Sequence, residues 1–367
     1  MSNLKSLKPF FMPTPADFIK EQLDARDWTQ EDFADVLGYS IQTIHKLLKK
    51  NTPITIDVAN ALAKAFNQTP QYWLNLDNIY RLRLRNNTEN DEAVAIRSKL
   101  FELFPINEMA KRLWIDKKDL INSVMRFFNA KSIEDILESK ISGLVFRKSE
   151  TFEERFNPNA ASCWFQMAKN VSSNIEVAPY NAAKLKLLSQ NLYQYTSKPN
   201  GVTEFLSELN DCGVRFFVLS HLPKTYIDGA AFLINSVPTI VFTARHKRLD
   251  NFWFTMAHEI GHILLHLNSK MWYIIDSDSQ EMNQMESEAN QEAAKMLRHE
   301  EIFNALGRKD YLSSPSITEA ANQIGVHPCI IIGALSHEKT SYHKRLQEFN
   351  EDIMGLIPDI YHVEKRS

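Results

Sequence analysis

The stretch DNFWFTMAHEIGHILLH, residues 250–266, constrains this chain most, because it is apolar nearly all round yet carries ionisable side chains. A helix that is hydrophobic on every side is buried, and buried histidines and carboxylates are costly without a metal ion or hydrogen-bonding partners. On a helix, His258 and His262 lie one turn apart on one face, so both imidazoles can reach a single tetrahedral Zn²⁺. Glu259 stands beside the first histidine, where it is placed to act as the general base of a hydrolysis. The motif therefore predicts half of a metal site.

The HExxH motif is short, and average residue frequencies produce it by accident in roughly one chain in a hundred of this length. A third ligand decides its interpretation. His266 cannot be that ligand, because it lies eight residues beyond His258, about 12 Å along a helix that rises ~1.5 Å per residue. A carboxylate from a second helix remains, as in catalytic zinc sites built from two histidines and one glutamate.

The segment MESEANQEAAKML, residues 285–297, is the second helix that this interpretation needs. Advancing by three and four residues from Glu286 gives a small, mostly apolar face that can approach the HExxH helix closely. Glu288 falls on the opposite, solvated face. We therefore predict Glu286 as the third metal ligand. Asn290, one turn further, is expected to hold a ligand side chain through its amide.

Three runs of β-branched and aromatic residues predict strands, at 213–219, 230–235 and 238–243. The short connection Asn235–Pro238 closes a hairpin, so at least part of the sheet is antiparallel. We expect an extended substrate to add to the edge of this sheet near 238–243. The remaining patterns are helical, and the fold class predicted is mainly α with a small α+β domain.

The N-terminal segment 27–50 has the pattern of two short helices joined by a tight turn. Thr29 is the expected cap of the first helix, and Gly38 stands where that helix must end in a left-handed turn. Ser40 caps the second helix, whose apolar face comprises Ile41, Ile44, Leu47 and Leu48. This is the spacing of a helix-turn-helix.

Polar side chains are left on the outer face of the second helix or at its end: Gln42, Thr43, Lys46, Lys49 and Lys50. Gln and Thr can read base edges in a major groove, and Lys is suited to phosphates. The alternative is a helical packing or dimerisation module, because residues 14–39 hold seven acidic side chains against Lys20 and Arg26. The net charge of −3 also requires any DNA contact to come from a local patch.

This segment resembles the lambda-repressor/Cro-like helix-turn-helix domains, and more closely the HigA-type antitoxin regulators. The likeness extends through ITIDVANALAKAFNQTPQYWLNLDNIY, residues 54–80. It implies a double-stranded DNA operator as partner, with Gln30 on a phosphate and with four side chains facing the groove: Ser40, Gln42, Thr43 and Lys46. Cro-like heads commonly read paired half-sites, which would make the chain a homodimer.

The pair FWFTMAHEIGHILLH and ESEANQEAAKML resembles the ImmA/IrrE family of zinc metallopeptidases, which is gluzincin-like. The family pattern ExEANxxA falls on Glu286 to Ala293, and the likeness covers roughly residues 200–300. It implies zinc bound by His258, His262 and Glu286. It also implies a regulatory setting, such as toxin–antitoxin control, phage immunity or a stress response.

Two functions stay open from the sequence. In the first, the chain is a DNA-binding regulator whose zinc-dependent endopeptidase domain cleaves a regulatory protein partner. In the second, it is an antitoxin-like or stress-response regulator whose zinc domain senses or binds a partner without proteolysis. The residue that would stabilise the transition state is open too, and the candidates by type alone are His327, His337, Tyr342 and His343.

The domain division predicted is 1–80 for the helix-turn-helix, 81–200 for a helical connector and 201–367 for the peptidase-like domain. Within the last, 316–335 repeats the helix-turn-helix spacing, but its second helix is too apolar to read bases and is expected to pack instead. Ser316 and Glu319 are expected to cap the first helix of this repeat. The three cysteines are widely spaced and no apolar run reaches ~20 residues, so the protein is expected to be cytoplasmic and off the membrane.

Overall fold

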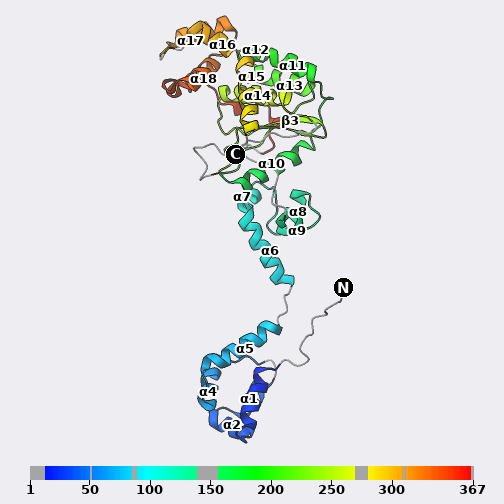
Figure 1. Cartoon of the computed structure of the whole chain (residues 1–367), viewed down its shortest axis with the longest axis vertical. Helices are drawn as coiled ribbons and strands as arrows, with labels where there is room; N and C mark the ends of the chain where they lie inside the picture. The colour runs from blue at the N-terminus through cyan, green and yellow to red at the C-terminus, as the bar shows by residue number, and fades with distance from the viewer. Residues whose placement is uncertain are drawn as a thin grey trace. The chain divides into compact units, whose positions relative to one another are not determined.

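The computed structural model describes residues 13–49, 52–84, 89–138, 156–268, 280–307, 309 and 311–364. The chain divides into two compact units, Met1–Ala95 and Ile96–Ser367. As the sequence predicts, the architecture is mostly helical with one small sheet (Figure 1). Among the described residues, no helix is both long and apolar enough to cross a membrane. The finer division at residues 80 and 200 stays a prediction.

The first unit is a cluster of short helices: α1 (Pro15–Asp24), α2 (Gln30–Leu37), α3 (Ile41–Leu47), α4 (Ile56–Phe66) and α5 (Pro70–Leu84), with α6 (Glu89–Leu103) following in the chain. Thr29 caps α2 through a reciprocal pair of hydrogen bonds with Asp32. Gly38 ends α2 at a φ of 68°, which confirms the predicted left-handed turn. The core comprises Ile19, Phe33, Ile44, Leu62, Phe66 and Trp73.

Helices also make up most of the second unit. Those before the sheet are α7 (Ile106–Lys111), α8 (Leu120–Phe128), α9 (Ile133–Glu138), α10 (Pro158–Ser172), α11 (Ala182–Gln190), α12 (Leu192–Thr196) and α13 (Gly201–Asp211). Those after it are α14 (Leu249–Leu265), α15 (Gln280–Met296), α16 (His299–Leu306), α17 (Ser314–Ile324) and α18 (Pro328–Glu338). The 3-10 turns η1 (Thr340–Arg345), η2 (Ile353–Gly355) and η3 (Asp359–Tyr361) complete the unit.

The sheet has the order β1-β3-β2, from β1 (Arg215–Val218), β2 (Gly229–Ile234) and β3 (Val237–Phe242). β2 and β3 form the predicted antiparallel hairpin, and Asn235 and Ser236 take positive φ values in its turn. β1 pairs with β3 in parallel. The expectation that a substrate adds to an edge near 238–243 is therefore wrong, because both sides of β3 are already paired.

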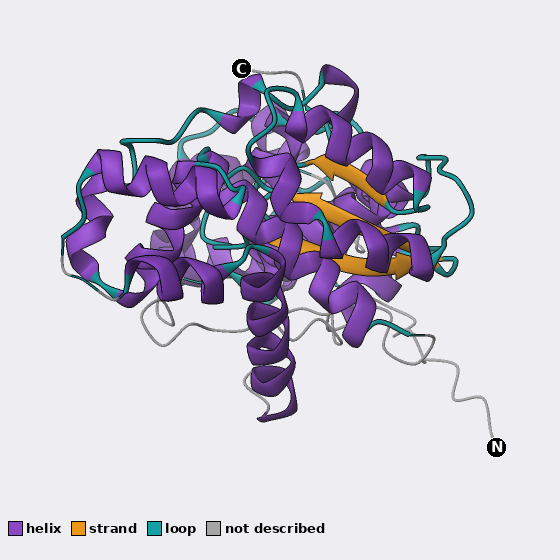
Figure 2. Ribbon diagram, turned by 90° about the horizontal axis from the view of Figure 1, so that it is seen from above, coloured by secondary structure: helices purple, strands orange, loops and turns teal. Residues whose placement is uncertain are grey.

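Alternate side chains of the sheet belong to two different cores. Phe216 and Phe242 pack in one core with α14 and with α11 and α12, which fall within the predicted connector. Phe217 and Val241 pack in the other core with α7 to α10. Helices therefore cover both faces of the sheet (Figure 2). This arrangement buries α14 between the sheet and the C-terminal helices.

The C-terminal pair α17 and α18 is a packing unit, as its composition predicts. α18 buries Cys329, Ile330, Ile331, Ile332, Ala334 and Leu335. The predicted cap of α17 is wrong, because the cap is Ser313 and its hydroxyl accepts a hydrogen bond from the backbone of Ser316. With Pro315 in the first turn, α17 starts at Ser314, and Ser316 already lies inside the helix.

Candidate metal centre and nucleic-acid interface

α14 and α15 approach each other closely where both carry small residues. A Cβ atom added to Gly261 would lie 3.4 Å from both Cα and the carbonyl oxygen of Ala289. Ala289 and Ala293 on the facing side of α15 are fully buried. The crossing agrees with the small face that the sequence places after Glu286. Because the helix backbones are this close, side chains one turn away on each helix can meet.

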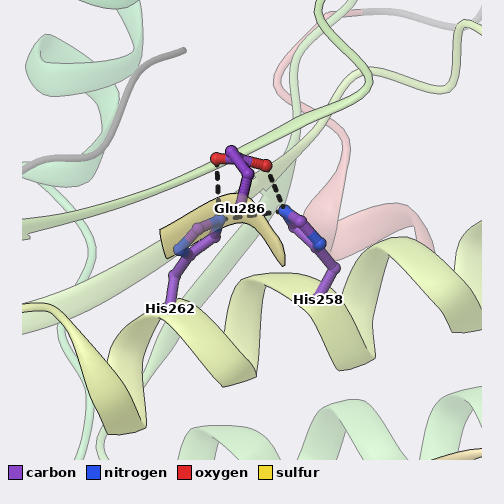
Figure 3. A group of neighbouring side chains, drawn as sticks. All are labelled: His258, His262 and Glu286. Atoms are coloured by element: carbon purple, nitrogen blue, oxygen red, sulfur yellow. Dashed lines mark hydrogen bonds and ion pairs between the residues drawn. The ribbon is translucent and has the colours of Figure 1, made fainter. Parts of the chain in front are cut away.

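Three side chains of these helices converge, as Figure 3 shows. Nε2 of His258 lies 3.2 Å from Oε2 of Glu286, and Nε2 of His262 lies 3.1 Å from Oε1 of the same carboxylate. The two Nε2 atoms are 2.9 Å apart. Among the described residues, this trio is the group of histidine, cysteine and acidic side chains close enough to hold a metal ion.

The other nitrogen of His258 is occupied by Asn290. Its Nδ1 lies 2.9 Å from Oδ1 of Asn290. An amide oxygen only accepts hydrogen bonds, so Nδ1 of His258 carries a proton and donates it to Asn290, and Nε2 is the nitrogen that faces Glu286. The sequence led us to expect such a contact for Asn290, whose amide oxygen here accepts from His258. It leaves the imidazole oriented as a metal ligand requires.

Charge couples the three side chains. Burial disfavours protonation of His258, but its hydrogen bond to Glu286 and the charges of Glu259 and Glu286 outweigh it and raise the pKa of His258 to about 8. Burial lowers the pKa of His262 below its ordinary value. Burial also opposes the charge on Glu286, yet the hydrogen bonds from both histidines hold its pKa well below the usual range. The carboxylate is thus ionised, and at neutral pH the protonated imidazole of His258 compensates its charge.

This donor set fits Zn²⁺. Two imidazole nitrogens and a carboxylate oxygen are its usual protein ligands in catalytic sites, and they leave one position for water or substrate. Two ligand nitrogens and an anion this close together need a cation among them, either a proton or a metal ion. The trio is therefore a possible metal site, and its assignment stays a prediction.

Glu259 is buried, at 6% exposure, on the side of α14 that faces the sheet. A Cβ atom added to Gly229, the first residue of β2, would lie 2.8 Å from Oε1 of Glu259. The carboxylate therefore lies against the start of this strand, in space that only a glycine leaves open. Its role as general base stays a prediction.

The structure separates the four candidates for a transition-state stabiliser. Tyr342 is fully buried and its hydroxyl donates to the carbonyl of Lys309. His343 contacts the carbonyl of Ser336, and His327 caps α18 by accepting from the backbone of Cys329. The ring of His337 lies 5.5 Å from that of Phe254, which is one turn before His258 on the HExxH helix.

His337 also lines a small pocket, about 60 Å³ in volume, beside α14. The pocket walls include Arg248, Asp250, Phe254, Leu297, His299, Ile330 and His337. The ring of Phe254 lies 6.3 Å from that of His258, so one aromatic side chain connects the pocket with the candidate metal ligands. The sequence does not reveal this pocket, because its walls come from segments up to about ninety residues apart.

Sequence analysis missed a pair of residues behind His262. His266, excluded as a ligand, is 8% exposed and its Nδ1 lies 3.1 Å from Nδ1 of His262. Glu288 is 43% exposed, in keeping with the predicted solvated face, yet its carboxylate lies 3.0 Å from Nε2 of His266. The available sign was the spacing of four residues from His262 to His266, which keeps both on one face of the helix.

The side chains predicted to face DNA belong to α2, to α3 and to the residues that flank α3. Gln30, Ser40, Gln42, Thr43, Lys46 and Lys49 are all exposed. Ser40 caps α3, and its hydroxyl lies 2.9 Å from that of Thr43. Ile41 was expected on the buried face but is 37% exposed, because it is the first residue of a seven-residue helix. Lys50 lies outside the described residues.

Known protein families match one segment in each of the two units of the chain. A family model described as Helix-turn-helix matches residues 19–73, and one described as IrrE N-terminal-like domain matches residues 213–326. The chain thus belongs to the helix-turn-helix transcriptional regulators, and it carries an ImmA/IrrE-like domain. Among its relatives is the uncharacterised helix-turn-helix-type transcriptional regulator YddM of Escherichia coli (strain K12), 33% identical over 70 residues, which span 19% of this chain and 74% of that protein.

Proposed function

We propose that this regulator is a zinc-dependent endopeptidase that cleaves a regulatory protein partner. The observation that carries the proposal is the convergence of His258, His262 and Glu286, with interatomic distances of 2.9 to 3.2 Å between their donor atoms. Zn²⁺ bound there would polarise the scissile carbonyl and lower the pKa of water to about 7. The known domains alone would also be consistent with a regulator that binds a partner without cutting it.

Glu259 supplies the proton transfers in this proposal. It takes a proton from the attacking water as the carbon–oxygen bond forms, and it gives that proton to the amine nitrogen as the peptide carbon–nitrogen bond breaks. Its carboxylate lies against Gly229, and its charge acts on the neighbouring imidazole of His258. His337, across Phe254 from His258, is the candidate that supports binding of the substrate carbonyl or its neighbours.

An extended peptide would reach this site along β2. Within the described sheet, the outer side of β2 pairs with no other strand, and the strand begins beside Glu259. Main-chain hydrogen bonds to a sheet edge hold a peptide extended and tolerate many side chains. We therefore place the substrate along β2, the edge strand of the hairpin, and not along the central strand β3 that the sequence suggested.

Zinc content and cleavage test the proposal together. Wild type is expected to contain about one zinc per chain, and mass-spectrometric profiling of new protein N-termini in cells is expected to reveal cleavage of a partner. Glu259→Gln should keep the zinc and abolish that cleavage, because only the proton transfers are removed. Glu286→Ala should lose zinc.

The outcomes separate the two functions. If Glu286→Ala contains as much zinc as wild type, the assignment of Glu286 as a zinc ligand is wrong. If Glu259→Gln leaves every N-terminus and the regulatory phenotype unchanged while zinc is bound, the domain senses or binds a partner without proteolysis.

For the first unit, we propose that α3 enters the major groove of an operator read by two copies of the chain. The exposure of Gln42, Thr43 and Lys46 on one short helix supports this assignment. The double variant Gln42→Ala/Lys46→Ala is tested in a gel shift on the gene's own promoter. We expect its DNA affinity to fall at least tenfold, because a lost base contact costs about 1–3 kcal/mol of binding free energy. Lys64→Ala, an exposed lysine on α4, is the matched control. No shift with wild type would refute the operator proposal.

A further inference from the structure

We propose that Glu288 and His266 position His262 as a metal ligand, so that a carboxylate outside the ligand set controls the zinc affinity of the site. The inference rests on the proposed function, because it concerns the same metal centre. It goes beyond that function in naming two positioning residues and the order in which they act.

The contacts form an unbroken chain from the surface to the ligand. Oε2 of Glu288 lies 3.0 Å from Nε2 of His266, and Nδ1 of His266 lies 3.1 Å from Nδ1 of His262. The other oxygen of Glu288 accepts a hydrogen bond from Nε2 of Gln284 at 2.8 Å. Both oxygens of the carboxylate are thus held, and the side chain cannot turn away without losing two partners.

Hydrogen-bond roles in this chain follow from its surface end. An ionised carboxylate only accepts, so Nε2 of His266 carries a proton and donates it to Glu288. A neutral His266 then has a lone pair at Nδ1, which accepts from Nδ1–H of His262. The remaining nitrogen of His262, Nε2, is left with a lone pair that faces Glu286 and Nε2 of His258. The chain therefore fixes the tautomer that a metal ligand needs.

The two histidines differ in what stands behind them. His258 donates to a neutral amide, that of Asn290, whereas His262 is linked through a second imidazole to a negative charge. A charged acceptor makes the ligand nitrogen more basic than a neutral one does. Loss of the Glu288 chain should therefore cost more zinc affinity than its exposed position suggests.

The test measures zinc affinity of the full-length protein by competition with a chromophoric chelator. His266→Leu is expected to weaken zinc binding by about 10–100-fold, the usual effect of removing a partner behind a ligand. His266→Asn keeps an acceptor oxygen near the position of Nδ1 and should restore most of the affinity. Glu288→Ala should weaken binding, and Glu288→Gln, which keeps an acceptor without the charge, should weaken it less.

Two further measurements exclude a merely structural effect. Adding Glu288→Ala to His266→Leu should lower the zinc affinity no further, because the hydrogen bonds that link Glu288 to His262 are already lost. The visible absorption of bound Co²⁺ should change in His266→Leu and return toward wild type in His266→Asn. Glu292→Ala is the matched control, since Glu292 is one turn beyond Glu288 on α15 and its carboxylate pairs with Lys295.

The possible failures are distinct. A wild-type protein that binds no zinc overturns the proposed function and this inference with it. Wild-type zinc affinity in folded Glu288→Ala and His266→Leu overturns this inference alone. Equal losses in Glu292→Ala and Glu288→Ala would assign the effect to the charge of α15 and also overturn it. Glu288 is exposed enough that its substitution should leave the fold intact.

Discussion

Replacing His299 by phenylalanine is expected to make the Ile96–Ser367 unit less sensitive to acid. Burial disfavours the charged imidazole and the charge of His337 adds to this, so the pKa of His299 falls from 6.5 to about 4. The unfolded chain therefore takes up this proton at a higher pH than the folded chain. The contribution of His299 to the free energy of unfolding is therefore complete above about pH 6.5 and is lost as the pH falls toward 4. The loss is ~1.4 kcal/mol per pH unit, or about 3 kcal/mol in all.

Phenylalanine is a suitable replacement because it keeps the ring contacts of His299 with Phe254 and Phe303 but cannot be protonated. Calorimetric unfolding of both full-length proteins between about pH 7 and about pH 4 measures the difference. Wild type should lose about 3 kcal/mol more than the variant over this range. The transition of the Met1–Ala95 unit is an internal reference and should move equally in both. If the free energy of unfolding of the Ile96–Ser367 unit depends on pH equally in wild type and in the variant, the argument from burial of His299 is refuted.

Three further outcomes can be checked directly. Gly229→Ala should retain zinc but reduce partner cleavage by about a hundredfold, because the new Cβ would displace the Glu259 carboxylate; unchanged cleavage would contradict this. Asp77→Ala should destabilise the Met1–Ala95 unit alone by about 1–3 kcal/mol, since Asp77 accepts from the backbone of Ile54 and from Arg81; calorimetry would expose a smaller loss. Native protein should show no thiol reactive toward a disulfide reagent, and guanidinium should release all three, because burial raises the pKa of Cys163, Cys212 and Cys329.

Features that depend on neighbouring residues were predictable from the sequence. The cap at Thr29, the left-handed end at Gly38 and the turn at Asn235 each depend on a few adjacent side chains. The approach of Glu286 to the HExxH helix was also predictable, because helical periodicity fixes which residues of α15 share its small face. These are interactions whose geometry is set by backbone chemistry and regular spacing.

Features that depend on distant segments were not. The central place of β3 follows from its parallel pairing with β1, some twenty residues earlier, and no local pattern encodes this partner. The contact of Glu288 with His266 requires a long side chain to bend from an exposed face, which periodicity does not describe. Both Ser313 and Ser316 could have been the N-cap of α17. Pro315 in the first turn of the helix favours Ser313, the earlier of the two.

The C-terminal segment has a consequence for how the sheet meets other molecules. His362 bridges to Val218, and the backbone of Val363 donates to the carbonyl of Val218, so the last described residues cover part of the outer side of β1. An uncovered strand edge is a template for pairing with another chain. The fold thus protects one border of its sheet with its own tail. A chain shortened before His362 would expose that border and is expected to self-associate, whereas a tag added after the tail would leave it covered.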